Sequence, residues 1–219
     1  MKPLILLNFK LYSQTAGKKG IERAKAIATL RQKKYRIAIA PSLLTTSELA
    51  RSISLPVFAQ HTDAVLDGAL TGHISLSELQ SLNVKGTILN HSERKIDLLT
   101  LQKTILLCRK KKLITVVCGS TITEVKRIAA FHPDYIAYEP AELIGGKISV
   151  ATAKPGIILK AVQAVRKISP KTNVLCGAGV QTKQDVQQAL RLGAQGVLIG
   201  HAVAKANNPK RFLEKMLQD

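Results

Sequence analysis

Residues 113–140 read LITVVCGSTITEVKRIAAFHPDYIAYEP, and they contain the unit that decides the fold. The unit consists of two short apolar runs, 114–117 and 135–138, with a helical pattern between them. Thr121 and Glu124 have the spacing of a capping box, in which two side chains satisfy free N–H groups at a helix start. Neither run alternates with polar residues, which is typical of strands buried on both faces of a parallel sheet. This stretch therefore predicts a β–α–β unit.

The same unit repeats along the chain. Short apolar runs recur about every 20 to 30 residues, with helical patterns between them. We count eight runs, at residues 4–7, 37–40, 57–59, 87–89, 114–117, 135–138, 174–176 and 197–199. Eight strands that alternate with helices over 219 residues predict one α/β domain, residues 1–219. They favour a closed (β/α)8 barrel, although the periodicity alone also fits an open doubly wound sheet.

Polar residues and glycines predict where helices begin and where the chain turns. The capping-box spacing recurs in three more places: Thr45…Glu48, Ser75…Glu78 and, in a weaker version, Thr182…Asp185. Gly193 suits the position just after a helix end. Residues 61–72 carry Asp67-Gly68 and Thr71-Gly72, so we expect a loop there rather than a helix.

The charge balance is strongly basic. Lysine and arginine number 33 against 14 aspartates and glutamates, which gives a formal net charge of +19. Such a charge attracts anions, whether phosphorylated metabolites, nucleic acid or acidic lipid. Many of the basic residues fall in predicted helices, where a solvated face is the usual explanation. The chain has no tryptophan and only four Phe and four Tyr, so we do not expect dedicated nucleic-acid binding.

Several other classes of protein are disfavoured. No apolar run reaches the roughly 18 residues that span a bilayer, and the start, 1–9, is too short for a signal peptide, so we expect a cytoplasmic protein. Three cysteines without Cys-x-x-Cys spacing predict neither disulfides nor a zinc site, and Cys118 and Cys176 are expected to be small buried hydrophobes. The histidines show no ligand spacing, so we expect no metal.

Candidate catalytic side chains follow the predicted strands. Asn8 and Lys10 come at the end of the first run, His91 follows the fourth, and Glu139 ends the sixth. In a barrel these positions share the face that carries active sites. Taken singly, each has an ordinary explanation, such as a surface charge or a helix cap. Because all four are expected on the same face of the barrel, a functional role for the group is favoured over four separate ordinary explanations.

The contexts of His91 and Glu139 suggest proton chemistry. We expect His91 to lie at a helix start, where the helix dipole disfavours imidazolium and leaves a neutral electrophile. Glu139 precedes a segment with Pro140 at one end and Gly145-Gly146 at the other, which suggests a base beneath a hinged lid. Gly177–Gly179 follow the seventh run and Gly200-His201 the eighth, where barrels often bind phosphate through backbone N–H groups.

These motifs together resemble one family. Asn8-Phe9-Lys10, Asn90-His91-Ser92-Glu93-Arg94, Tyr138-Glu139-Pro140 with Leu143-Ile144-Gly145, and Cys176-Gly177-Ala178-Gly179 are similar to those of triosephosphate isomerases, particularly the short archaeal form. Gln60-His61 and Thr71-Gly72-His73 resemble that form's third loop. The resemblance covers nearly the whole chain and implies a TIM barrel.

The resemblance also implies an activity and roles for residues. The activity is the interconversion of dihydroxyacetone phosphate and D-glyceraldehyde 3-phosphate through an enediolate in glycolysis and gluconeogenesis, without a cofactor. Glu139 would be the base and neutral His91 the electrophile. Lys10 would hold the substrate and stabilise charge, Asn8 would position these groups and contact the substrate, and Glu93 would be in support. The remaining implied contacts are to the substrate phosphate, and they come from Ile144, Gly145, Gly179, Gly200 and His201. A homotetramer or homodimer, joined through the loop at about residues 61–73, is implied as well.

Two positions depart from the family pattern, and two alternatives stay open. Gly145-Gly146-Lys147 stands where Gly-Thr-Gly is expected, and His201 stands where a small residue is expected. One alternative is another phosphate-binding barrel such as an aldolase, but no lysine lies within the predicted strands four to eight for a Schiff base. The other is a basic scaffold that binds RNA or partner proteins, which the charge suggests and the catalytic set opposes.

Overall fold

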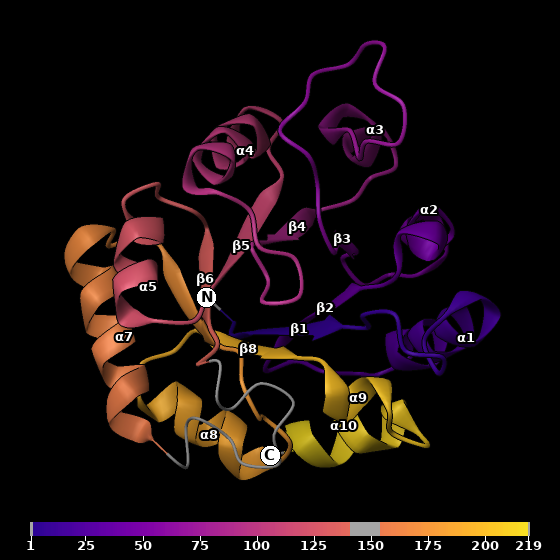
Figure 1. Ribbon diagram of the computed structural model, residues 1–219. Coiled ribbons are helices and arrows are strands. Elements are labelled where there is room, and N and C mark those ends of the chain that lie inside the picture. Colours follow the sequence, from indigo (N-terminus) through magenta and orange to yellow (C-terminus); the bar gives the residue numbers. More distant parts are fainter. Residues whose placement is uncertain (1, 141–153, 219) are drawn as a thin grey trace.

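The computed structural model describes residues 2–140 and 154–218, and its centre is a ring of parallel strands (Figure 1). The eight strands are β1 (Leu4–Asn8), β2 (Arg36–Ala40), β3 (Phe58–Ala59), β4 (Gly86–Leu89), β5 (Ile114–Gly119), β6 (Tyr135–Tyr138), β7 (Asn173–Cys176) and β8 (Gly196–Ile199). They pair in the order β2-β1-β8-β7-β6-β5-β4-β3. A parallel bridge between Ile39 and Val57 joins the two ends of this order. The predicted closed barrel is therefore confirmed.

Helices surround the strands (Figure 1). They are α1 (Gly17–Ala28), α2 (Leu43–Ser52), α3 (Leu76–Ser81), α4 (Leu98–Lys110), α5 (Ile122–Ala129), α7 (Pro155–Ile168), α8 (Lys183–Arg191), α9 (His201–Ala204) and α10 (Pro209–Leu217). Because each strand leads into a helix that returns to the opposite end of the barrel, all strands run the same way. Their carboxyl ends consequently open on one face.

The core has two layers, and alternate strand residues contribute to each. In β1, Leu4 and Leu6 pack inside the barrel, whereas Ile5 and Leu7 pack outward against the helices. All four side chains are fully buried. This arrangement explains why the apolar runs lack polar alternation, as predicted for a parallel sheet with both faces covered.

Serine or threonine caps α3, α5 and α8 as predicted, but of the predicted capping boxes in the described part of the chain only the one at α8 is complete. Ser75 and Thr121 accept hydrogen bonds as N-caps, and Thr182 with Asp185 forms a complete capping box, although its sequence signal is the weaker one. The prediction at Thr45 is wrong. Helix α2 already begins at Leu43 after Ser42, and the Thr45 hydroxyl donates back to the Ser42 carbonyl at 3.1 Å.

The segment 61–72 is a loop, as predicted, and Asp63 organises it. One Asp63 oxygen accepts the Ile74 N–H at 2.7 Å, and the other lies 3.0 Å from His61 Nε2. The Thr62 hydroxyl donates to the Ile74 carbonyl at 2.9 Å. Gly193, at φ +91°, follows the end of α8, as its sequence position indicated.

The capping box of α8 provides a test of local stability. Asp185 accepts from the backbone and the hydroxyl of Thr182, and the Asp185 N–H donates to that hydroxyl. Thr182→Ala should lower the free energy of unfolding by about 1 kcal/mol, because the Asp185 N–H loses its acceptor. Thr182→Ser keeps the hydroxyl and should lose much less. Urea unfolding with an unchanged m-value checks this, and equal losses in both variants would contradict it.

Candidate active site

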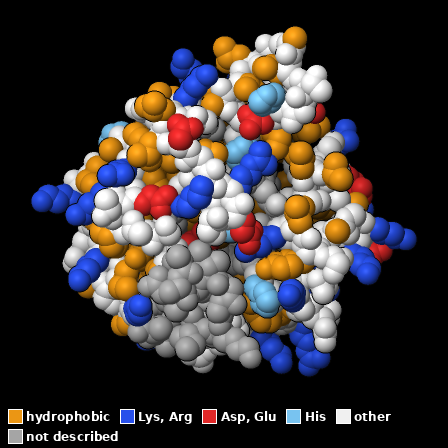
Figure 2. Space-filling view, in the orientation of Figure 1, with side chains coloured by type: hydrophobic (Ala, Val, Ile, Leu, Met, Phe, Trp, Pro, Cys, Tyr) orange, Lys and Arg blue, Asp and Glu red, His pale blue; other side chains and the backbone are white. Residues whose placement is uncertain are grey.

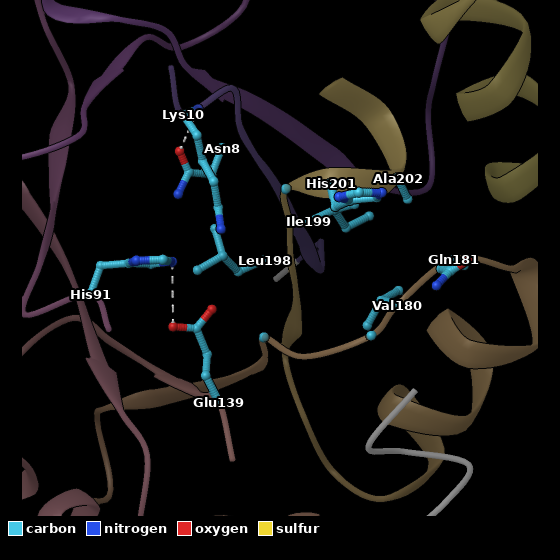
Figure 3. Close-up of a pocket in the computed structure, with 13 residues that line it drawn as sticks. Asn8, Lys10, His91, Glu139, Val180, Gln181, Leu198, Ile199, His201 and Ala202 are labelled. Carbon is cyan, nitrogen blue, oxygen red and sulfur yellow. Dashed lines mark hydrogen bonds and ion pairs between the residues drawn. The ribbon is translucent and has the colours of Figure 1, made fainter. Parts of the chain in front are cut away.

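Side chains from separate strand ends converge on one pocket at the carboxyl face of the barrel (Figure 3). Asn8 and Lys10 reach it from β1, His91 from β4 and Glu139 from β6. The predicted phosphate-loop residues line it as well: Gly179, Gly200 and His201. Figure 3 shows the His91 ring pointing at the Glu139 carboxylate, with the Lys10 side chain directed toward the same space. Ile144 and Gly145 lie outside the described residues.

The Glu139 side chain is buried, which is unusual for a carboxylate. Its side chain lies on the backbone of Gly177, where an added Cβ would stand 2.4 Å from Glu139 Cγ. Within the described ranges, Glu139 Oε2 is a buried atom without a hydrogen-bond partner. Burial raises the pKa of Glu139 to about 7, against the lowering effects of the Cys118 thiol and the Lys10 cation. A carboxylate with this pKa can both take and return a proton near neutral pH.

His91 is held as a neutral imidazole. Its Nδ1 accepts the Glu93 N–H at 3.2 Å, so the ring proton lies on Nε2. Nε2 is 3.7 Å from Glu139 Oε2. Burial and the Lys10 cation lower the pKa of His91 to about 4, and the Glu93 carboxylate offsets only part of this. Glu93 Oε2 lies 3.6 Å from Nδ1, but a neutral ring with no proton on Nδ1 forms no ion pair with it.

The expectation that His91 lies at a helix start is wrong. Helix α4 begins only at Leu98, with Asp97 as its N-cap. His91 instead opens a tight turn, in which the Arg94 N–H donates to the His91 carbonyl at 2.8 Å. The neutral state therefore comes from burial and neighbouring cations, not from a helix dipole.

Lys10 is held in a backbone conformation that residues with a Cβ rarely adopt, at φ +48°. The Asn8 Oδ1 accepts the Lys10 N–H at 3.0 Å, and the Gln60 side chain donates to the Lys10 carbonyl at 3.1 Å. The Lys10 ammonium donates to Glu93 Oε1 at 2.6 Å. Its stem passes over Gly200, where a Cβ would lie 3.1 Å from Lys10 Cε. These contacts explain how Asn8 and Glu93 fix the cation at the pocket.

The opposite end of the pocket is built from small residues at the ends of β7 and β8. Gly179 has φ +69°, and Gly200 immediately precedes the short helix α9. His201 is the first residue of α9, and its ring meets the edge of Tyr12, with ring centroids 5.9 Å apart. Lys205 places its ammonium 5.0 Å from the centre of the same Tyr12 ring. His201, which departs from the family pattern, thus packs against Tyr12 in the loop after β1 and lines the pocket together with Gly200.

Sequence reasoning missed the roles of three residues that shape the site. The Cys118 thiol contacts the Glu139 carboxylate through a hydrogen bond, whereas the sequence suggested only a small buried hydrophobe. Asn90 supports the turn that follows its own strand end, through a bond to the Ile96 N–H, and Gln60 supports Lys10 from the end of β3. Cys118 did carry a signal, because it stands near the carboxyl end of β5, on the face where the other candidates gather.

Other kinds of site find little support in the part of the chain that the structure describes. It contains no cluster of three or more His, Cys, Asp or Glu side chains placed to hold a metal ion. No helix among these residues is long and apolar enough to cross a membrane. All three cysteines are buried, and no disulfide joins them in the described ranges.

Comparisons with known proteins agree with the geometry. The family model for triosephosphate isomerase matches residues 3–217. The triosephosphate isomerase of Methanosarcina mazei is 38% identical over 217 residues, covering 99% of this chain and 98% of its own. That of Methanocaldococcus jannaschii is 38% identical over 216 residues, covering 98% and 99%. That of Archaeoglobus fulgidus is also 38% identical over 216 residues, covering 98% and 96%. The chain therefore belongs to the triosephosphate isomerase family.

Proposed function

We propose that Glu139 and His91 carry the proton transfers of triose phosphate isomerisation in this chain. The reaction interconverts dihydroxyacetone phosphate and D-glyceraldehyde 3-phosphate in glycolysis and gluconeogenesis and needs no cofactor. One observation carries the assignment: the buried Oε2 of Glu139 lacks a partner among the described residues and lies 3.7 Å from His91 Nε2. A substrate that enters the pocket meets a base and a hydrogen-bond donor together.

Glu139 moves the carbon-bound proton. As the carboxylate it takes a proton from the carbon beside the carbonyl, and the electron pair of that C–H bond forms the enediolate. As the carboxylic acid it returns the proton to the neighbouring carbon. Burial supports both steps, because the pKa of about 7 places the carboxyl group close to its midpoint at neutral pH.

His91 and Lys10 stabilise the charge that develops on oxygen. The Nε2–H of neutral His91 donates a hydrogen bond to the substrate oxygens and relays protons between them. The Lys10 ammonium, anchored through Asn8 and Glu93, attracts the negative enediolate. Such preorganised groups act strongly in a dry site, because little water screens them.

The phosphate group occupies the glycine-lined end of the pocket. Backbone N–H groups around Gly179, Gly200 and His201 meet its oxygens, and small residues allow the close approach. Ile144 and Gly145 complete this end in our proposal as parts of a closing lid. Keeping the phosphate away from Glu139 places the reacting carbons beside the carboxylate.

We also propose that the enzyme is cytoplasmic and forms a homodimer or homotetramer. Large hydrophobic side chains are exposed near the site and on the loop 61–73, including Leu11 at 79%, Leu66 at 67% and Leu70 at 43% exposure. A cleft lined by Leu11, Tyr12 and Gln60 adjoins the site. A second copy of the chain would cover such apolar surface.

Replacing the base tests the proposed function most directly. Glu139→Gln keeps the shape of the side chain but removes its basicity, so kcat should fall about 10³-fold in a coupled triose phosphate assay. Glu22→Gln, which alters a carboxylate on α1, is the control and should retain full activity. Circular dichroism checks that both variants are folded. A folded wild type that is inactive on both triose phosphates would overturn the proposal.

The burial of Glu139 predicts an acid limb in the pH profile. Only the ionised base is active, so kcat/KM should fall about tenfold for each pH unit below a midpoint near the pKa of about 7. His91, with a pKa of about 4, stays neutral over this range. The substrate phosphate also titrates, near pH 6, and could produce a similar fall in kcat/KM. The pH dependence of the ¹³C shift of the Glu139 carboxyl, measured in the enzyme without substrate, shows whether Glu139 is the group responsible. A midpoint at the ordinary glutamate value would contradict the prediction.

Gly177 tests how closely the base is positioned. In Gly177→Ala the new Cβ would overlap Glu139 Cγ, so the carboxylate must move. A displacement of about 1 Å commonly costs around 100-fold in rate, and we expect kcat to fall by about that factor. Gly156→Ala is the matched control, because nothing lies within 4 Å of its added Cβ. Equal activity of the two variants would show that Glu139 tolerates displacement.

A further inference from the structure

A carboxylate outside the pocket is connected to the turn that carries His91. Glu124 lies in the first turn of α5, and its Oε2 accepts from the N–H of Ser120 at 2.8 Å and from the Ser120 hydroxyl at 2.9 Å. Its Oε1 accepts from Asn90 Nδ2 at 2.8 Å and from Lys95 Nζ at 2.7 Å. Oε2 is therefore held by the residue just before the N-cap of its own helix, whereas Oε1 accepts from donors of another segment, at positions 90 and 95.

This pattern differs from an ordinary helix cap, and the chain itself supplies the comparison. At α8 the corresponding acidic residue, Asp185, accepts from the N–H of Gln181, as Glu124 does from that of Ser120, but Asp185 also accepts from the N–H and the hydroxyl of the N-cap, Thr182. Among the residues that the structure describes, the Glu124 carboxylate makes no such bond to its N-cap, Thr121, although the Thr121 hydroxyl accepts the Glu124 N–H. One oxygen of Glu124, Oε1, is thus directed across to the strand end that leads into His91.

Asn90 transmits this contact to the catalytic turn. Its amide donates to Glu124 and to the Cys118 carbonyl at 3.0 Å, while its Oδ1 accepts the Ile96 N–H at 3.1 Å. Asn90 also has φ +55°, a conformation that needs support from its surroundings. Its side chain consequently ties together the end of β5, the start of α5 and the far end of the segment 91–96.

Lys95 forms the second connection. It lies within the segment 91–96, and its ammonium pairs with Glu124. The two connections hold the segment at both ends, beside His91 at Asn90 and near its exit at Lys95 and Ile96. The same segment contains the Glu93 N–H that selects the His91 tautomer.

We propose that Glu124 is a positioning residue for His91, acting through Asn90 and Lys95 to hold the turn that aims the imidazole at Glu139. The inference rests on the proposed role of His91. It predicts that Glu124 affects turnover rather than substrate binding, because it touches neither the pocket nor the phosphate loops.

A double-mutant cycle tests the connection. Glu124→Ala removes the carboxylate, and Asn90→Gly removes the linking side chain while glycine keeps the left-handed backbone without strain. Each should lower kcat about tenfold with little change in KM, because the imidazole is less well aimed. Since the two residues act as one unit, the double variant should be no slower than the slower single variant.

Two controls separate positioning from helix capping. Thr121→Ala removes the N-cap of the same helix but leaves the carboxylate of Glu124, so stability should fall while kcat is kept. Glu78→Ala removes an acidic residue from the first turn of α3 and should leave kcat unchanged. If Glu124→Ala lowers stability as Thr121→Ala does and leaves kcat intact, Glu124 is only a helix cap and the proposal fails. Fully additive losses in the double variant would also overturn it.

The imidazole itself gives a readout that does not depend on activity. In the wild type, ¹⁵N spectra of labelled protein should show His91 as the Nε2–H tautomer alone. In Glu124→Ala the second tautomer should appear, because the Glu93 N–H no longer stays aligned with Nδ1. An unchanged His91 spectrum contradicts positioning. If instead Glu139→Gln keeps activity, the proposed catalytic roles fail, and the ¹⁵N result still decides the structural link.

Discussion

The burial of the Glu139 carboxylate is the constraint on which the rest of the site depends. Moving a carboxylate out of water is costly unless donors compensate, and Oε2 has no such donor among the described residues. The packing of the surrounding protein must therefore offset the free-energy cost of burying this carboxylate. Backbone from the end of β7 lies directly against the side chain, the Cys118 thiol contacts it from β5, and the barrel core beneath is fully buried. A rigid scaffold can hold a group that an isolated loop could not.

The same scaffold explains which features could be predicted from the sequence. Apolar runs and their spacing determine where strands end, so Asn8, Lys10, His91 and Glu139 were placed on one face before any contact was known. That His91 opens a turn rather than a helix was not predictable in this way, because the ends of that turn are held by bonds from Asn90 and Lys95 to residues 118 and 124, which are distant in the sequence. The hydrogen bond between Asn90 and Glu124 was missed for the same reason. Their partners lie on different strand ends, and a capping spacing in the sequence cannot indicate that a carboxylate reaches past its own helix.

The basic residues that give the chain its net positive charge are arranged differently from the charged residues at the pocket. Around the pocket, cations have partners: Lys10 pairs with Glu93, and Lys95 with Glu124. Elsewhere lysine and arginine side chains are scattered over the visible face rather than gathered beside one groove (Figure 2). Surface charges farther than about 8 Å from a ligand are largely screened at physiological salt. The excess of +19 therefore adds a diffuse attraction for anions, while recognition depends on the few charges that are held in place.

Exclusion of water from the pocket shifts the pKa values of both proton-transfer groups. Desolvation favours the uncharged form of any group, so it raises the pKa of Glu139 and lowers that of His91. Lys10 acts on both in the same direction, which holds back the rise at Glu139 and deepens the fall at His91. The result is a carboxyl group that exchanges a proton near neutral pH beside an imidazole that keeps its Nε2–H. A charged partner could not replace burial in producing this pair of pKa values. An added cation would lower the pKa of Glu139, and an added anion would raise that of His91 and favour imidazolium. The pairing of a titrating acid with a permanently neutral donor thus requires that water be excluded from the pocket.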